Sequence, residues 1–269
     1  MRSVFGSMGK MAGLIFHFRK ILFATTRVEI SKRYAGSSLG LIWVVLYPML
    51  LLSVYLFVYL VVFKMRFPGY SGMDYVLYVF AGLVPFIGLS EAIQAGSVSL
   101  KQNIHLVKNV MLPLELIPVR AVTSALVGQC VLLALVAILA AANGTLSPFV
   151  LLLPVVLVLQ MLLLLGVVFV LSAVSLVVQD VNYFVNLALM LLMFLSPIGY
   201  RPEMLPPEYA AVVWLNPVSY LCDAYRFTLL STHSPSPAFL WAYALSSLAA
   251  FALGSAFFLR FKGALVDYE

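Results

Sequence analysis

Long apolar runs separated by short polar segments dominate this chain. Six runs approach or exceed the length of a membrane-crossing helix, because about 20 residues that rise about 1.5 Å each cross the roughly 30 Å hydrocarbon core of a bilayer. They cover residues 38–63, 76–98, 114–142, 149–177, 183–200 and 238–260. The fifth run is the shortest. The pattern predicts an all-α integral membrane protein with six transmembrane helices.

The N-terminal segment, about residues 10–34, has amphipathic helical spacing. Its apolar positions are Met11, Leu14, Ile15, Phe18 and Leu22, while Lys10, His17, Lys20 and Arg27 fall mostly on the other side. This spacing predicts an amphipathic helix in the plane of the membrane interface. A cleaved signal peptide is not expected, because Arg19 and Lys20 stand where a small-residue cleavage site would be. An ordinary basic tail beside the membrane is the alternative.

A second amphipathic stretch, about residues 99–112, follows the second apolar run. Its apolar positions are Leu100, Ile104, Val107 and Met111, and its polar positions are Lys101, Gln102, His105, Lys108 and Asn109. We expect a short helix that ends before Pro113, since the residue before a proline avoids helical geometry. A surface helix with no further role is the plain interpretation.

The polar segment between the fifth and sixth runs, about residues 201–236, contains two apolar pieces. Residues 207–215 and 217–231 are each too short to cross a membrane. Asn216 followed by Pro217 is typical of a helix cap and a first helical position. We predict two short re-entrant helices on the outer side, buried against protein because exposed irregular backbone is not tolerated in lipid. A passive outer cap is the alternative.

The composition and the charge distribution extend this picture. The chain is 64% hydrophobic and 10% charged with a mean hydropathy of +1.08, whereas a soluble domain has about 25% charged residues. Of the 16 Lys and Arg residues, twelve lie in segments 1–37, 99–120 and 260–269, and four lie in the segments between. The positive-inside rule therefore predicts that both termini are cytoplasmic. The basic pI of about 9.3 indicates this topology and attraction to anionic lipids, and no nucleic acid is expected as a partner.

The sequence shows few of the patterns that are typical of a catalytic or metal site. The sequence has no Gly-x-x-x-x-Gly-Lys-Ser/Thr loop for a nucleotide, and no His and Cys residues at the spacing of metal ligands. Glu91 is the clearest ionisable residue within a span, where it could relay protons or pair with Gln94 or a neighbouring helix; we favour pairing. Cys130 and Cys222 are expected to be packing residues without a disulfide.

Three stretches carry a resemblance to a known family. They are KRYAGSSLGLIWVVLYPML, NIHLVKNVMLPLELIPV, and VVQDVNYFVNLALMLLMFLSPIGY followed by LNPVSYLCDAYR. In this order they resemble the ABC-2 superfamily permease subunits of bacterial exporters for O-antigen, capsular polysaccharide or teichoic acid. The chain departs from the common pattern at Leu112 and at Gln179, where the family often has an aromatic residue and an arginine. Asp180 keeps an expected role as the N-cap of the fifth span.

The resemblance implies a function and a set of partners. A single permease domain, residues 1–269, would form a homodimer served by two separate ABC ATPase subunits. ATP and Mg would bind to those partners, and this chain would carry no cofactor, metal or catalytic residue. The substrate would be a lipid-linked polysaccharide, moved across the bacterial inner membrane. The alternatives are an ABC-2 exporter of drugs or lipids, a proton-coupled secondary transporter that uses Glu91, and a scaffold without transport.

The basic stretch before the first span is a candidate entry site for lipid pyrophosphate. It comprises Lys32, Arg33, Tyr34, Ser37 and Ser38. Either serine could cap the first span, whose N-terminal amides favour an anion, and the two cations add positive charge nearby. Tyr34 suits the level of the lipid headgroups. Positive-inside anchoring alone is the alternative.

Three further sites are expected. Tyr55, Tyr59 and Phe63 share one face of the first span and are predicted to line the polymer channel beside the fifth span, with core packing or an interfacial belt as the alternative. By resemblance, Leu100, Lys101, Ile104, His105 and Lys108 belong to a coupling helix that docks on the ATPase. Also by resemblance, Trp214, Asn216, Pro217 and Tyr220 belong to periplasmic gate helices.

Overall fold

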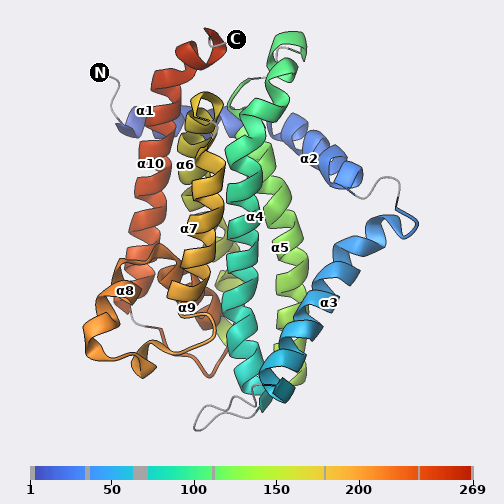
Figure 1. Cartoon of the computed structure of the whole chain (residues 1–269), viewed down its shortest axis with the longest axis vertical. Helices are drawn as coiled ribbons and strands as arrows, with labels where there is room; N and C mark the ends of the chain where they lie inside the picture. The colour runs from blue at the N-terminus through green and yellow to red at the C-terminus, as the bar shows by residue number, and fades with distance from the viewer. Residues whose placement is uncertain are drawn as a thin grey trace.

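The computed structural model describes residues 4–33, 37–62, 72–110, 113–178, 180–235 and 237–267, and these residues are mostly helical. Among the described residues, four helices are long and apolar enough to cross a membrane. They are α4 (Gly72–Val110), α5 (Leu116–Ala142), α6 (Leu153–Val177, preceded by a 3-10 turn at Pro148–Leu152) and α10 (Pro237–Asp267), and they stand side by side in Figure 1. An all-helical membrane fold is therefore confirmed.

The first and fifth predicted spans form shorter helices. The α3 helix (Trp43–Phe57) continues as one π-helical turn (Val58–Val62) and stands apart from the bundle over most of its length (Figure 1). The α7 helix (Val181–Leu195) has 15 residues. Its N-cap position is Asp180, but the Asp180 side chain makes no capping hydrogen bond, so the expected capping role is wrong. A count of six spans stays a prediction.

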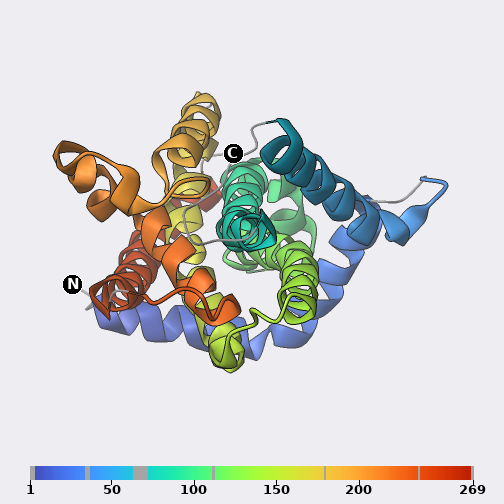
Figure 2. The same cartoon turned by 90° about the horizontal axis from the view of Figure 1, so that it is seen from below.

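The N-terminal segment forms two helices where one was predicted. The α1 (Val4–His17) and α2 (Arg19–Arg33) helices meet at Phe18 and run across one end of the bundle (Figures 1 and 2). The predicted apolar face points inward, since Met11 and Leu22 are buried, whereas Lys10 on the other side is exposed. This face packs on the protein, with α1 against α10 and α2 against α5.

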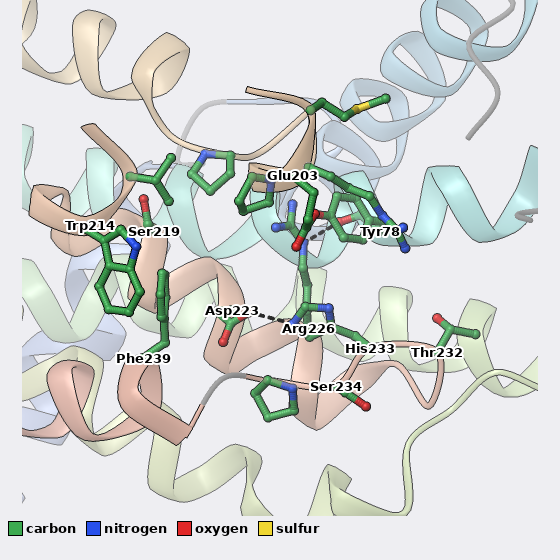
Figure 3. A pocket seen from close by; sticks show the side chains of 16 residues that line it. Tyr78, Glu203, Trp214, Ser219, Asp223, Arg226, Thr232, His233, Ser234 and Phe239 are labelled. Carbon is green, nitrogen blue, oxygen red and sulfur yellow. Dashed lines mark hydrogen bonds and ion pairs between the residues drawn. The ribbon is translucent and has the colours of Figure 1, made fainter. Parts of the chain in front are cut away.

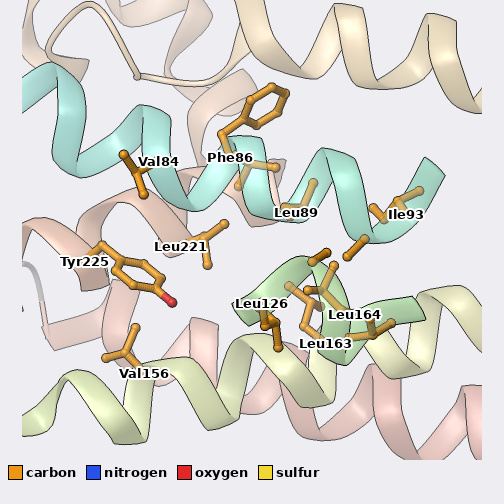
Figure 4. Close-up of a cluster of buried hydrophobic side chains, with 14 of the residues drawn as sticks. Val84, Phe86, Leu89, Ile93, Leu126, Val156, Leu163, Leu164, Leu221 and Tyr225 are labelled. Atoms are coloured by element: carbon orange, nitrogen blue, oxygen red, sulfur yellow. The ribbon is translucent and has the colours of Figure 1, made fainter. Parts of the chain in front are cut away.

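The α6 and α10 helices cross with their backbones in direct contact. A Cβ atom on Gly166 would lie 2.2 Å from the backbone of Ala250, and one on Gly254 would lie 2.1 Å from the Gly166 carbonyl oxygen. Small residues at a crossing let two helix backbones touch, which is a common way to pair helices in membranes. Beside this pair, apolar side chains of α4, α5, α6 and α9 form the core (Figure 4).

The predicted coupling helix is part of α4. The span ends at Asn103, whose backbone angles (φ −125°, ψ 15°) are not helical, and a shorter helical segment follows this kink to Val110. The Asn103 side chain donates to the Ser99 carbonyl at 2.9 Å and accepts from Arg120 at 2.9 Å. Residues 99–102 thus belong to the span, and the helical segment beyond the kink covers the rest of the predicted helix as far as Val110; its role in coupling stays a prediction.

Ion pairs join segments that were predicted to lie on the same side of the membrane. The contacts are Glu29–Arg120 at 3.1 Å and Glu115–Lys262 at 2.6 Å at one end, and Asp223–His233 at 2.6 Å at the other. The C-terminus, α1 and the kinked end of α4 share the first of these ends (Figure 1). The basic segments assigned to the cytoplasm thus gather at one end of the bundle, and their sidedness stays a prediction.

The outer segment contains the two short helices that were predicted, α8 (Ala210–Leu215) and α9 (Pro217–Leu229). Asn216 separates them and accepts from the Val218 backbone N–H at 2.9 Å, and Pro217 occupies the first position of α9. The α9 helix is buried in the bundle, where burial raises the pKa of the Cys222 thiol to about 11 and keeps it a neutral packing group. Burial against protein is therefore confirmed for α9 but not for α8, which leaves Trp214 49% and Leu215 82% exposed. Insertion into the outer leaflet stays a prediction.

Candidate functional site

A cavity of about 790 Å³ opens at the end of the bundle that carries α8 and α9 (Figure 3). The α4 helix, the chain after α7, both short helices and the start of α10 contribute to its walls. Its aromatic, basic, acidic and hydroxyl side chains come from segments far apart in the sequence. We call it the outer cavity.

A buried arginine organises one wall of the outer cavity. Arg226 is 2% exposed, and its Nε donates to the Tyr78 carbonyl at 3.1 Å while its Nη2 donates to the Ile198 carbonyl at 2.9 Å. Its guanidinium carbon also lies 3.6 Å from the centre of the Tyr78 ring, which is cation–π geometry. A Cβ atom on Gly82 would approach Nη2 to 2.8 Å, so only glycine leaves the guanidinium this room.

Hydrogen bonds from α4 and α9 hold the chain that follows α7. Besides Arg226, the hydroxyl of Tyr75 donates to the Gly199 carbonyl at 3.2 Å and that of Tyr78 donates to the Tyr200 carbonyl at 3.5 Å. Three side chains thus hold three consecutive residues, 198–200, against α4 and α9. Sequence reasoning counted Arg226 only as an outer positive charge, and its burial could not be inferred from that count.

A second polar group lies between α9 and the chain before α10. Asp223 pairs through Oδ1 with Nε2 of His233 at 2.6 Å. The other carboxylate oxygen of Asp223 and the hydroxyl of Ser219 are buried, and neither has a hydrogen-bond partner among the described residues. Ser219 and Asp223 are four residues apart on α9, so both face the cavity from one side of that helix.

The opposite wall is aromatic and contains Trp214, one of the four predicted gate residues. The rings of Trp214 and Phe239 lie 4.5 Å apart, and Tyr220 meets Phe239 edge-on at 5.1 Å. The Tyr220 hydroxyl also donates to the Trp214 carbonyl. The structure therefore brings Trp214 and Tyr220 together, while Asn216 and Pro217 form the junction between their two helices.

Sequence reasoning missed a polar cluster in the middle of the bundle. Gln129 on α5 and Gln160 on α6 exchange side-chain hydrogen bonds at 2.7 and 2.9 Å, and both contact the Tyr225 hydroxyl on α9. Gln160 also donates to the Pro85 carbonyl on α4 at 3.2 Å. All four helices are thereby tied together. One side-chain amide in each of the α5 and α6 spans was the available signal, because such a group needs a partner in a membrane.

The proposed entry residues are only partly described. Lys32 is exposed and lines a cavity of about 190 Å³ between α2 and α5, together with Glu29 and Arg120. The exposed Ser37 and Ser38 precede a 3-10 turn, and Ser37 accepts from the Gly40 N–H through its backbone carbonyl at 3.1 Å. The α3 helix begins only at Trp43. The Arg33 side chain and Tyr34 lie outside the described residues.

The proposed channel residues lie largely outside the described residues as well. Tyr55 and Tyr59 belong to α3 and its π-helical turn by backbone, but their side chains are not described, and neither is Phe63. A π-helical turn is closed by i→i+5 hydrogen bonds and holds more residues than an α-helical turn, so it changes the four-residue register on which their shared face was predicted. Both α3 and α7 leave large apolar side chains exposed.

The coupling residues divide between the core and the end of α4. Leu100 is fully buried in the core, so its side chain cannot also lie on a docking face in this conformation; the expected contact with a partner is wrong for this residue. Lys101 is exposed. Ile104, His105 and Lys108 follow the kink in the last turns of α4, and their side chains lie outside the described residues.

Neither a metal site nor a proton path emerges from the described residues. No group of three His, Cys, Asp or Glu side chains among them could hold a metal ion. Glu91 is half-buried on α4 and faces α5, where a Cβ atom on Gly128 would lie 3.9 Å from its Oε2. This placement agrees with an acid packed against a neighbouring helix.

Comparison with known proteins identifies a family. The model of the ABC-2 type transporter family matches residues 21–230. An O-antigen export system permease protein RfbA of Myxococcus xanthus is 27% identical over 237 residues, which cover 87% of this chain and 89% of that protein. A protein of the same name from Klebsiella pneumoniae is 26% identical over 208 residues, covering 77% of this chain and 78% of its own.

Proposed function

This chain belongs to the ABC-2 type transporter family, and we propose that it is the transmembrane subunit of an ATP-driven exporter of a lipid-linked polysaccharide. The observation that carries the proposal is the similarity, along most of the chain, to proteins named as O-antigen export permeases. The four apolar helices and the buried polar contacts between them fit a permease that must stay folded in lipid.

Energy would come from a separate subunit. The sequence has no phosphate-binding loop, so ATP and Mg are assigned to two ABC ATPase partners bound to a homodimer of this chain. The large apolar side chains that α3 and α7 expose offer surfaces for lipid and for the second copy. The basic end of the bundle would face the cytoplasm of a bacterial inner membrane, with both termini on that side.

The kinked end of α4 is the proposed coupling element. Arg120 on α5 donates to Asn103 at the kink and also pairs with Glu29 on α2. A tilt of the α4 end would therefore displace both α5 and α2. Lys101, Ile104, His105 and Lys108 are the residues that we assign to the ATPase contact. Leu100 is excluded from it because it is buried.

The proposed path begins beside α2 and ends at the outer cavity. Lys32 and Arg33, with Tyr34, Ser37 and Ser38, would receive the pyrophosphate of the lipid anchor by charge-assisted hydrogen bonds. Tyr55, Tyr59 and Phe63 would line the channel. The α8 and α9 helices would act as the outer gate, since hydrogen bonds hold the chain before them at residues 198–200.

The proposal is tested by reconstitution. A tagged copy of the chain should bring down an ATPase with a phosphate-loop motif, and the purified chain alone should hydrolyse no ATP. Lys101→Glu together with Lys108→Glu should weaken ATPase coupling, because both reverse charge on the proposed docking side. Lys10→Glu, an exposed lysine on α1, is the matched control. Robust hydrolysis by the chain alone would overturn the proposal.

A further inference from the structure

The outer cavity has one aromatic wall and one polar wall. Trp214 is 49% exposed, so one part of its ring is buried against Phe239 while the rest faces the opening. Glu203, Asp223 and Arg226 lie across from this pair (Figure 3). The volume of about 790 Å³ falls within the roughly 300–1,000 Å³ of small-molecule sites. A ligand that fills it must therefore present an apolar face to one side and polar groups to the other.

The charges of the cavity argue for a neutral ligand. Two cations, Arg201 and Arg226, and two carboxylates, Glu203 and Asp223, line the same space. The guanidinium of Arg226 already donates to two backbone carbonyls and covers the Tyr78 ring, so it is poorly placed to hold an anion. Carboxylates nearby would repel a phosphate. Balanced charge thus favours a ligand with many uncharged donors and acceptors.

Two buried polar atoms in the cavity wall point to hydroxyl partners. Ser219 is 1% exposed, and its hydroxyl has no hydrogen-bond partner among the described residues. The Oδ2 atom of Asp223, one helical turn away, is buried and lacks a partner there too. Buried polar groups are nearly always hydrogen-bonded, so an acceptor-only carboxylate oxygen beside a hydroxyl is the arrangement expected for binding an alcohol.

We propose that the outer cavity is a carbohydrate-binding site, in which one hexose unit stacks its apolar ring face on Trp214 and donates hydroxyl hydrogens to Asp223, with Ser219 as a second contact. Sugar rings have an apolar C–H face and a rim of hydroxyls, which matches the two walls. The assignment rests on the proposed function for the source of the sugar, an exported chain that passes the outer gate. It adds a place where a single unit is held as the polymer leaves.

The test measures sugar binding to the full chain in lipid nanodiscs, because common detergents carry glycoside headgroups that would compete. Trp214 is made the only tryptophan by Trp43→Phe and Trp241→Phe. The methyl glycosides of D-mannose, D-galactose, D-glucose and L-rhamnose are each titrated to about 100 mM, since single sugars bind weakly. We expect at least one to change Trp214 fluorescence with saturation. Inorganic phosphate is the comparison probe and should leave the signal unchanged.

Variants assign the binding to the cavity, with saturation-transfer NMR as a readout that does not need tryptophan. Trp214→Leu and Asp223→Asn should each weaken binding about tenfold or more, and Ser219→Ala about 3- to 10-fold, as expected for one lost hydrogen bond. Leu215→Ala is the control, because Leu215 is 82% exposed beside Trp214 and does not line the cavity. The melting temperature of each variant is measured as a control for folding.

Three results would overturn the assignment. They are the absence of saturation with every glycoside, equal binding by the parent and all three cavity variants, and saturation by phosphate in place of sugar. Failure of the proposed function would appear in a different measurement, as a chain that recruits no ATPase. The sugar-binding measurement therefore tests the cavity independently of ATPase recruitment.

Discussion

The contact between Arg226 and Gly82 can be tested by a double-mutant cycle. Arg226→Met keeps the length and apolar stem of the side chain but removes two hydrogen bonds from a cation to backbone carbonyls, at 3.1 and 2.9 Å. Each such bond contributes about 1.5–3 kcal/mol, and part of the loss is offset because a buried charge no longer has to be desolvated. We therefore expect Arg226→Met to lower the free energy of unfolding by about 2–4 kcal/mol.

Gly82→Ala disturbs the same contact from the other side. The new methyl group would lie 2.8 Å from Nη2 of Arg226, so the guanidinium must shift and weaken its bonds to the carbonyls of Tyr78 and Ile198. Crowding of this kind costs about 1–3 kcal/mol, against which alanine gains about 1 kcal/mol over glycine in a helix. In the Arg226→Met background the clash is absent and only the helix gain remains. The two substitutions should therefore couple by about 1–3 kcal/mol.

The cycle is measured by unfolding the four proteins in nanodiscs or in mixed micelles, followed by circular dichroism. Gly13→Ala is the control for helix propensity, because a Cβ atom there meets nothing within 4 Å. Equal effects of Gly82→Ala in both backgrounds would show that the guanidinium does not occupy the position described. An Arg226→Met protein as stable as the parent would show that the two carbonyl contacts contribute nothing.

Three further predictions concern the rest of the bundle. Gly166→Ala should destabilise strongly, because its Cβ would lie 2.2 Å from the α10 backbone, whereas Gly13→Ala should be neutral or slightly stabilising; equal melting temperatures would contradict this. Lys262→Met should lower the free energy of unfolding by about 1–3 kcal/mol, because it leaves the buried Glu115 carboxylate without its partner; adding Glu115→Gln should restore most of that stability in the same unfolding assay. Arg33→Ala should reduce export of a lipid-linked polysaccharide at matched expression, and equal export would favour the anchoring role alone.

Helix positions were largely predictable because two kinds of local feature indicate them, the apolar runs and the residues at the helix starts. Apolar runs defined the α5 and α6 helices to within a few residues, and Pro148 and Pro237 marked where the neighbouring helical segments start. Asn216 was identified as a cap from its own chemistry and the proline after it. These features depend on residues close in sequence, which a reader of the sequence can see.

The outer cavity was not predictable because its contacts join distant segments. Arg226 meets the carbonyl of Tyr78, 148 residues earlier, and Gln129 meets Tyr225, 96 residues later. The sequence shows that a buried amide or guanidinium needs a partner, yet it does not say which helix supplies the partner. For the same reason Leu100 was assigned to the amphipathic segment after the second span, although its side chain continues the buried face of α4.

The two ends of the molecule are connected by a helix that cannot slide past its neighbours. A Cβ atom on Gly88 would lie 1.8 Å from the Gln129 amide oxygen, and one on Gly96 would lie 2.5 Å from Val168, so α5 and α6 are each seated against a glycine of α4. Gln160 adds a hydrogen bond to the Pro85 carbonyl of α4. Interiors packed this closely transmit displacement, because neighbouring atoms have no free volume to absorb it. A tilt imposed on α4 at its kinked end would therefore carry α5 and α6 with it and reach the outer cavity, where the opposite end of α4 holds Gly199 and Tyr200 by hydrogen bonds.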